Sequence, residues 1–201
     1  MKAARLALLR GGVGAVRAEK LARDLHVTKG SFYWHFKDVS DVLDSLLLEW
    51  EEETATLFNR ALEHPDPHQG LRGLLEEVQR GVMLSERGEA PSDAAIFAWA
   101  AVSAPVAKVV NRVEKQRIQG LVRISGRPDR AELAYYAYLG FIMRRRRVPE
   151  AAEGFPLLAA TMLDLMLPQS KLSRSRAKSK RSYEKTTVHS AAGRQPASGK
   201  R

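Results

Sequence analysis

Apolar residues recur every three or four positions along most of the chain, which places them on one face of an α-helix. This spacing predicts helices at about 2–10, 17–25, 28–37, 39–62, 69–87, 92–102, 104–124, 130–147 and 151–167. No segment alternates apolar and polar residues in the way that a half-buried strand requires. We therefore expect an all-α fold. Asp38 or Ser40 is expected to cap the long fourth helix, and Asp129 the helix that begins near Arg130.

The first three predicted helices are short and follow one another closely. Three glycines within Gly11–Gly14 end the first helix, and a three-residue break separates the second from the third. Ala22 is small at the point where the third helix would cross the second. His26 occupies the turn, where a residue that tolerates a positive φ is needed, and the apolar Val27 follows it. This is the sequence form of a helix-turn-helix.

The third helix combines a buried face with an outer face rich in hydrogen-bond donors. Thr28 is a suitable N-cap, and Phe32 and Phe36 lie four residues apart, so that they share one face. The remaining side chains are donors and aromatic rings that point elsewhere: Lys29, Ser31, Tyr33 and Trp34. Such a helix is suited to lie against phosphates and base edges.

These residues resemble the DNA-binding domain of the TetR family of transcriptional regulators. The resemblance extends to about Leu48 and is carried mainly by Val16–Ala22 and by the run from Leu25 to Phe36. It implies that the third helix enters the major groove and that the flanking residues grip phosphates. The implied DNA-contacting positions are Arg17, Ala18, Thr28, Lys29, Gly30, Ser31, Tyr33, Trp34, His35 and Lys37.

Three positions depart from the family pattern. His26 stands where glycine is usual, and Arg17-Ala18 stand where a threonine often caps the second helix. Val39 stands where a phosphate-binding lysine is common, so one expected contact with DNA is missing. The missing lysine at position 39 therefore predicts a lighter footprint on DNA than is usual for the family.

The resemblance also implies the organisation and the partners of the whole chain. It implies a helix-turn-helix domain at 1–45 and a helical ligand-binding and dimerisation domain at 46–168. The composition of residues 169–201, rich in Ser, Lys, Arg, Ala and Gly, predicts a basic disordered tail. The expected protein is a cytoplasmic repressor without a cofactor or metal. It would bind a palindromic double-stranded operator as a homodimer and be released by a small apolar effector, whose pocket would shift the long fourth helix.

The effector and dimer sites are predicted from large apolar side chains in the helical domain. Candidates for lining an effector pocket, each of which could equally be plain core, are Trp50, Phe58, Met83, Phe97, Trp99, Tyr135 and Tyr138. The last two helices are apolar on more than one face, which favours a two-fold four-helix interface. Its candidate residues are Leu133, Ala137, Phe141, Leu158, Met162 and Leu165.

The net charge of the chain supports DNA binding less strongly than its total suggests. The net charge is +10, but the segment after Leu167 carries ten basic residues against one acidic residue, a net +9, so the remaining body is close to neutral. The case for DNA binding therefore depends on where charge is placed. The absence of cysteine excludes disulfides and thiol catalysis, and no apolar run approaches membrane-spanning or signal-peptide length.

Two other functions remain open at this point. The basic tail alone could bind nucleic acid without sequence preference, or the bundle could house an enzyme, although no spaced motif for an acid, base or nucleophile is evident. His64, Asp66 and His68 have a metal-like spacing, but two prolines among them favour a loop. Arg144–Arg147 could meet phosphate, but four consecutive residues point to different sides of a helix, which favours a solvated helix end.

Overall fold

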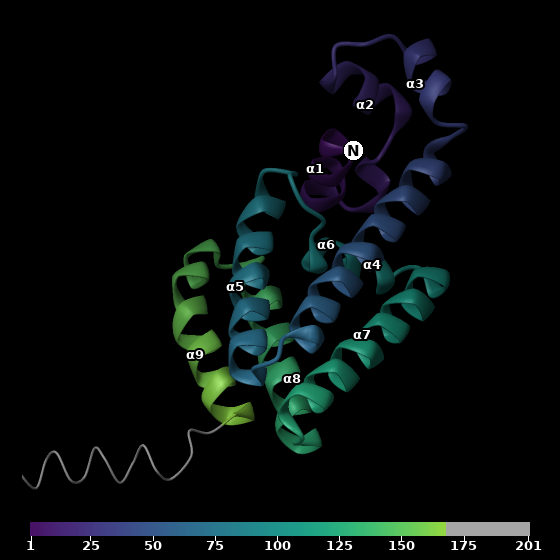
Figure 1. Ribbon diagram of the computed structural model, residues 1–201. Coiled ribbons are helices and arrows are strands. Elements are labelled where there is room, and N and C mark those ends of the chain that lie inside the picture. The colour runs from purple at the N-terminus through teal and green to yellow at the C-terminus, as the bar shows by residue number, and fades with distance from the viewer. Residues whose placement is uncertain (168–201) are drawn as a thin grey trace, which may run out of the picture. The chain divides into compact units, whose positions relative to one another are not determined.

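The computed structural model describes residues 1–167, which form one compact unit. Within these residues the chain is helical and has no strand, as predicted. Its N-terminal part consists of four short elements (Figure 1): α1 Lys2–Gly11, the 3₁₀ helix η1 Val13–Ala15, α2 Ala18–Asp24 and α3 Lys29–His35. The predicted basic tail lies outside the described residues.

Four helices follow in the middle of the chain: α4 Val39–Glu63, α5 Pro67–Glu86, α6 Asp93–Ala100 and α7 Ala104–Ser125. Asp38 caps α4, because its side chain accepts a hydrogen bond from the Asp41 amide at 3.0 Å. Asp66 caps α5 in the same way through the His68 amide at 2.8 Å. The segment with metal-like spacing is thus a helix-capping loop.

The C-terminal helices are α8 Pro128–Arg145, the 3₁₀ helix η2 Pro149–Gly154 and α9 Phe155–Met166. Two predictions here were wrong. Arg127, not Asp129, is the N-cap of α8, because Pro128 begins the helix and leaves Asp129 in its first turn. The last α-helix begins at Phe155 rather than near Ala151, because Pro156 lacks an amide hydrogen and fits only the first turn.

Three hydrophobic clusters form the core, and α4 takes part in the two larger ones. One cluster joins α1, α2 and α3 to α4, α6 and α7, with Trp50 on α4 among its members. The second joins the far end of α4, at Ala61, to α5, α7, α8 and α9. Figure 1 shows α4 running from α3 to the turn that leads into α5. The N-terminal helices are therefore packed onto the same helix that borders the rest of the bundle.

No helix among residues 1–167 is both long enough and apolar enough to cross a membrane.

Candidate functional site: a helix-turn-helix and a cavity in the bundle

The turn between α2 and α3 has the geometry that the sequence predicted. His26 adopts a φ of 55°, and within residues 1–167 it is the only non-glycine residue with a positive φ. Its amide donates to the Arg23 carbonyl, and the Val27 amide donates to the Ala22 carbonyl at 2.9 Å. These bonds close the C-terminus of α2. Histidine adopts this conformation at some energetic cost. The turn at His26 and its hydrogen bonds set the angle between α2 and α3.

The third helix separates its buried side from its exposed side clearly. Thr28 caps it by accepting from the Ser31 amide at 3.1 Å. Phe32 is buried at 6% exposure, whereas Tyr33 and Trp34 are 49% and 85% exposed. The ring centroids of Phe32 and Phe36 are 5.6 Å apart, and the Tyr33 ring lies edge-on to Phe32 with a centroid distance of 5.2 Å. Burial of Phe32 therefore holds two accessible rings on the outer side of the helix.

Nine of the ten predicted DNA-contacting residues are exposed, and the tenth is Ala18, which is buried. Any contact of Ala18 with DNA would therefore be through its backbone amide. Arg17 donates from Nε to the Gly14 carbonyl at 2.8 Å. Lys29 on α3 is paired with Glu19 on α2 at 2.5 Å, and this pair raises the pKa of the lysine. Lys29 would have to leave Glu19 before it could neutralise a phosphate.

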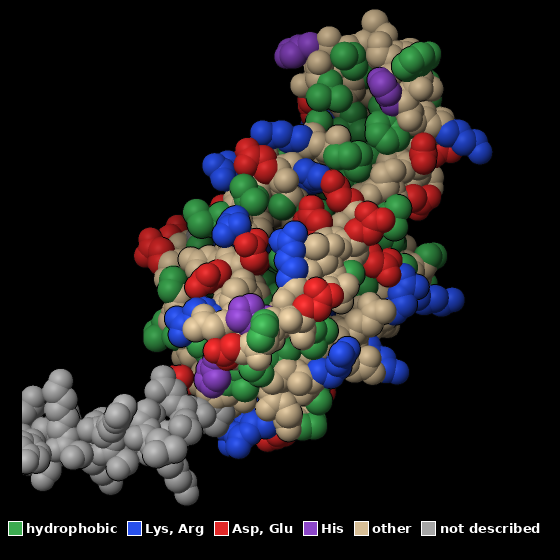
Figure 2. All heavy atoms as spheres, viewed as in Figure 1, with side chains coloured by type: hydrophobic (Ala, Val, Ile, Leu, Met, Phe, Trp, Pro, Cys, Tyr) green, Lys and Arg blue, Asp and Glu red, His purple; other side chains and the backbone are tan. Residues whose placement is uncertain are grey.

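The described body is polarised in charge even though its total is close to neutral. Residues 1–46 contain eight basic and five acidic residues, a net +3, and residues 47–167 carry a net −2. On the face shown in Figure 2, acidic and basic side chains are interspersed over the helices. The positive excess therefore lies in the helix-turn-helix segment, where a phosphate backbone would be met.

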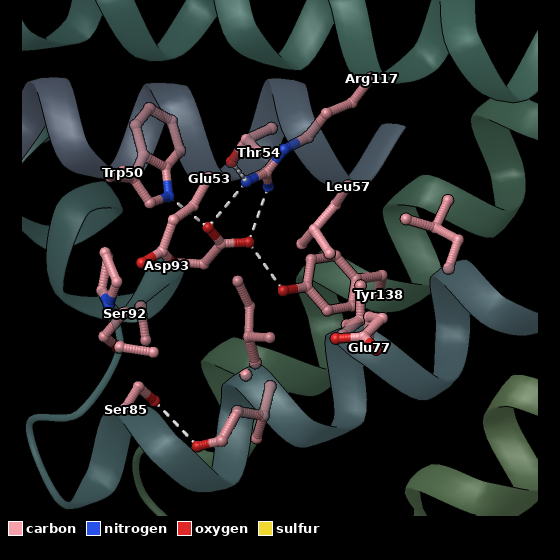
Figure 3. Close-up of a pocket in the computed structure, with 18 of the residues that line it drawn as sticks. Trp50, Glu53, Thr54, Leu57, Glu77, Ser85, Ser92, Asp93, Arg117 and Tyr138 are labelled. Carbon is pink, nitrogen blue, oxygen red and sulfur yellow. Dashed lines mark hydrogen bonds and ion pairs between the residues drawn. The ribbon is translucent and has the colours of Figure 1, made fainter. Parts of the chain in front are cut away.

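A cavity of about 340 Å³ lies in the middle of the bundle, between α4, α5, α6, α7 and α8 (Figure 3). This is within the range of roughly 300–1,000 Å³ that is typical of small-molecule sites. Leucines and other apolar residues form most of its wall: Leu9, Leu57, Phe58, Leu74, Leu75, Val78, Leu121 and Ile142. Leu9 belongs to α1, so the helix-turn-helix segment itself contributes to the wall.

A buried ion pair lies at one end of this cavity. Asp93 on α6 accepts four hydrogen bonds: two from Arg117 at 2.7 and 2.9 Å, one from the Tyr138 hydroxyl at 2.7 Å and one from the Trp50 indole. Arg117 also donates to the Thr54 hydroxyl at 2.7 Å. Its guanidinium stands over the Trp50 ring at 5.1 Å. Figure 3 shows these side chains converging from different helices.

Burial acts on both members of the pair, but their mutual attraction is stronger. Burial opposes the charge of Asp93, yet Arg117, Trp50 and Tyr138 hold the pKa of that carboxyl below its ordinary value. Burial likewise opposes the charge of Arg117, and Asp93 raises the pKa of the guanidinium. The pKa of the Tyr138 hydroxyl is raised well above its ordinary value by burial and by Asp93. All three groups therefore keep their usual protonation at neutral pH.

Comparison with known proteins agrees with the geometry of the N-terminal segment. Residues 1–46 match the family described as "Bacterial regulatory proteins, tetR family". This match covers the N-terminal segment of the chain only. Over 81 residues, 38% of this chain, it is 32% identical to the HTH-type transcriptional regulator AcrR of Shigella flexneri. The aligned stretch spans only 36% of that protein. No solved structure shows significant similarity to the chain.

Four of the seven residues predicted to line an effector pocket lie on the wall of this cavity. Trp50, Phe58, Tyr135 and Tyr138 line the cavity. The other three residues do not line it: Met83 is 58% exposed, Trp99 packs in the N-terminal cluster, and Phe97 packs edge-on against Trp50 from outside. They were chosen for size alone, which does not show on which side of a helix a residue lies.

The polar residues of the cavity wall were missed. Asp93 and Arg117 are far apart in sequence, and each looks like an ordinary surface charge. Arg145 was expected at a solvated helix end, but it pairs with Glu86 and lines the cavity. A charge that interrupts the apolar face of a predicted helix was the available signal, and Arg117 does this on α7 between Val113 and Leu121.

Two of the residues predicted for a dimer interface do not lie on the surface of the protomer. Phe141 and Met162 are buried inside the protomer, at 9% and 5% exposure, so they cannot face a partner. Ala137, Leu158 and Leu165 are only partly buried, and Leu133 is 57% exposed. The large apolar residues exposed on α8 and α9 are the predicted Leu133 and three others that were not predicted: Tyr136, Met143 and Leu157.

Proposed function

We propose that this chain is a transcriptional repressor that binds a palindromic operator as a homodimer and is released by a small molecule. The observation that carries the proposal is that α3 has one buried side and one exposed side. Phe32 anchors the helix in the core, while Trp34 and Tyr33 are presented outward within the family-matched segment. An exposed tryptophan is costly for solubility and is suited to pack against a nucleic acid backbone.

In the proposed complex α3 enters the major groove. Lys29, Gly30 and Ser31, at the start of the helix, would approach bases or phosphates, since Gly30 leaves this turn bare. Tyr33, His35 and Lys37 would contact the backbone, and Arg17 would grip a phosphate from the start of α2. All of these side chains are exposed, which agrees with such roles.

Effector release is supported by the way the cavity is joined to the N-terminal helices. α4 lines the cavity through Trp50, Thr54 and Leu57 and continues towards α3. Arg5 on α1 donates to Glu49 on α4 at 3.0 Å and to the Gly88 carbonyl, beyond α5, at 3.0 Å. A ligand that moved α4 or the α5–α6 segment would therefore displace α1 as well, and would alter the separation of two recognition helices.

A dimer through α8 and α9 is supported by their outer faces. On α8, Tyr136 follows Leu133 by three residues and Met143 follows Tyr136 by seven, and all three are exposed. On α9, Leu157 is 75% exposed. The three positions on α8 share one exposed apolar face, and Leu157 adds an exposed apolar side chain on α9. Pairing of these faces about a two-fold axis would place the two helix-turn-helix units for a palindrome.

The alternatives have less support. An enzyme in the bundle has less support, because the buried carboxylate of Asp93 is saturated by four donors and cannot act as a base. Binding by the basic tail alone would not need the exposed rings of α3. Footprinting of the DNA upstream of the chain's own gene tests the proposal. Protection of a palindrome supports it, and uniform protection that is lost when residues after 167 are removed supports the tail instead.

A further inference from the structure

A groove of about 800 Å³ lies between α1 and α2, in the N-terminal part of the molecule. Small and apolar side chains form its floor: Ala3, Leu6, Ala7, Ala15 and Leu25. Gly11 also lines this α1–α2 groove, and a Cβ at that position would lie 2.5 Å from the Cβ of Ala15. Any other residue at position 11 would push the end of α1 away from η1, so the local sequence shapes this end of the groove.

Positive charge surrounds this apolar floor. Besides His26, four cationic side chains line the groove against the single carboxylate of Asp24, a net +3 with the histidine counted as neutral: Lys2, Arg10, Lys20 and Arg23. Lys2 pairs with Glu89 at 3.4 Å and Lys20 with Asp24 at 2.7 Å. Within residues 1–167, the exposed Arg10 and Arg23 form no ion pair and donate no side-chain hydrogen bond. These two guanidinium groups can therefore receive carboxylates without breaking an existing pair.

The proposed function leaves this groove unused, because none of the ten residues assigned to DNA lines it. A phosphate backbone would satisfy the two arginines, but it presents little apolar surface to cover Leu25, which is 56% exposed. A peptide with both carboxylates and an apolar side chain would satisfy the arginines and the leucine together. Arginine clusters are a recurrent means of recognising acidic peptides, and guanidinium groups bind carboxylates through paired hydrogen bonds.

We propose that the α1–α2 groove binds an acidic peptide segment of a partner protein, with carboxylates on Arg10 and Arg23 and an apolar side chain against Leu25. Charge complementarity defines the partner: a segment rich in aspartate and glutamate that carries leucine or a similar residue. The inference goes beyond the proposed function, because binding in the groove needs neither an operator nor an effector. Since the groove and the DNA-contacting positions share no residue, the chain can hold DNA and the acidic partner at the same time.

The test uses the fluorescein-labelled peptide EELEELEE as the probe, and fluorescence anisotropy measures its binding to the full chain at neutral pH. Amides replace the carboxylates in QQLQQLQQ, which should bind at least about tenfold more weakly. Serines replace the leucines in EESEESEE, which should bind about three- to fivefold more weakly because less apolar surface is buried. Leu25→Ser should weaken EELEELEE by a similar factor and leave EESEESEE unchanged, as expected if Leu25 meets the peptide leucine.

The arginines are tested by a double variant with a matched control. Arg10→Gln combined with Arg23→Gln should weaken binding of EELEELEE by about tenfold. Arg60→Gln combined with Arg72→Gln removes the same charge from two exposed arginines on α4 and α5 that lie outside the groove. This control should change the affinity by less than about twofold.

Other occupants of the groove give different results. If EELEELEE binds the Arg10 and Arg23 double variant as tightly as the wild-type chain, the basic tail holds the peptide and the proposal is overturned. Equal losses in the two double variants, or no saturable binding of EELEELEE to the wild-type chain, would overturn it as well. Operator binding by the Arg10 and Arg23 double variant should stay within about twofold of wild type. An operator salt slope that becomes shallower by about 0.9 for each arginine would instead assign the groove to the DNA footprint.

Discussion

Arg117 on α7 donates to both oxygens of Asp93 on α6, at 2.7 and 2.9 Å, and the two side chains are 8% and 13% exposed. Through Thr54 and Tyr138 the same pair also reaches α4 and α8. Four helices around the cavity are therefore tied together by one polar network. The stability of the bundle should depend on both members being present.

Replacing Arg117 by methionine should lower the free energy of unfolding by about 3–5 kcal/mol, because it leaves the Asp93 carboxylate buried without its partner. Chemical denaturation followed by circular dichroism measures this. Arg112→Met is the control, since Arg112 pairs with Glu51 at 2.6 Å on the surface. It should cost less than about 1 kcal/mol. Equal losses in the two variants would show that the buried network has no special role.

Acid should weaken the fold in part through Asp93. The pKa of this carboxyl is lower in the folded chain than its ordinary value of 3.8, so its contribution is complete above that value and is lost as the pH falls below it. Unfolding free energies should therefore fall more steeply in the wild-type chain than in Asp93→Asn between about pH 4 and pH 2. Parallel curves for the two proteins would contradict the assignment.

Glu19 should restrain DNA binding, because it holds Lys29 at 2.5 Å. Glu19→Gln should raise operator affinity and make the salt dependence steeper by about 0.9 in the log–log slope, as expected when one more phosphate is neutralised. The pKa of Lys29 is raised chiefly by its hydrogen bond to Glu19, and the lysine stays charged in the variant. Anisotropy titrations at several salt concentrations give the slope. Glu77→Gln, far along the chain on α5, should behave as wild type.

Leu157 should be a central contact of the dimer. It is 75% exposed on α9, and Leu157→Asp should raise the dimer dissociation constant at least about tenfold, a cost of roughly 1.4 kcal/mol. Sedimentation equilibrium measures this constant. Val102→Asp is the control, since Val102 is equally exposed, at 76%, but lies between α6 and α7. A change in both variants, or in neither, would place the interface elsewhere.

The helix-turn-helix could be predicted from the sequence because its determinants are local. Thr28 caps α3 three residues from its partner, and the positive φ of His26 follows from its place in a short turn. The separation of Phe32 from Trp34 is set by helical spacing alone. In such a segment, neighbouring residues determine both the backbone conformation and which side chains are exposed.

The cavity could not be predicted in the same way, because tertiary packing creates it. Arg117 and Asp93 are 24 residues apart on different helices, and Arg145 meets Glu86 across the bundle. Apolarity also did not separate the core from the exposed side of α8 and α9. Phe141 and Met162 turned inward, whereas Leu157, one residue from Leu158, turned outward. The position of each helix face relative to its neighbours decides this, and no local pattern encodes it.

The central claim is that the outer face of α3 reads DNA, and its most direct test is the affinity of the full chain and of Trp34→Ala for a palindromic operator and for a scrambled duplex. The account predicts that the wild-type chain prefers the operator by about a thousandfold or more. Trp34→Ala should lose most of this preference while its unfolding free energy changes by less than about 0.5 kcal/mol, because the ring is 85% exposed. Equal affinity of the wild-type chain for both duplexes, or an undiminished preference in Trp34→Ala, would contradict it.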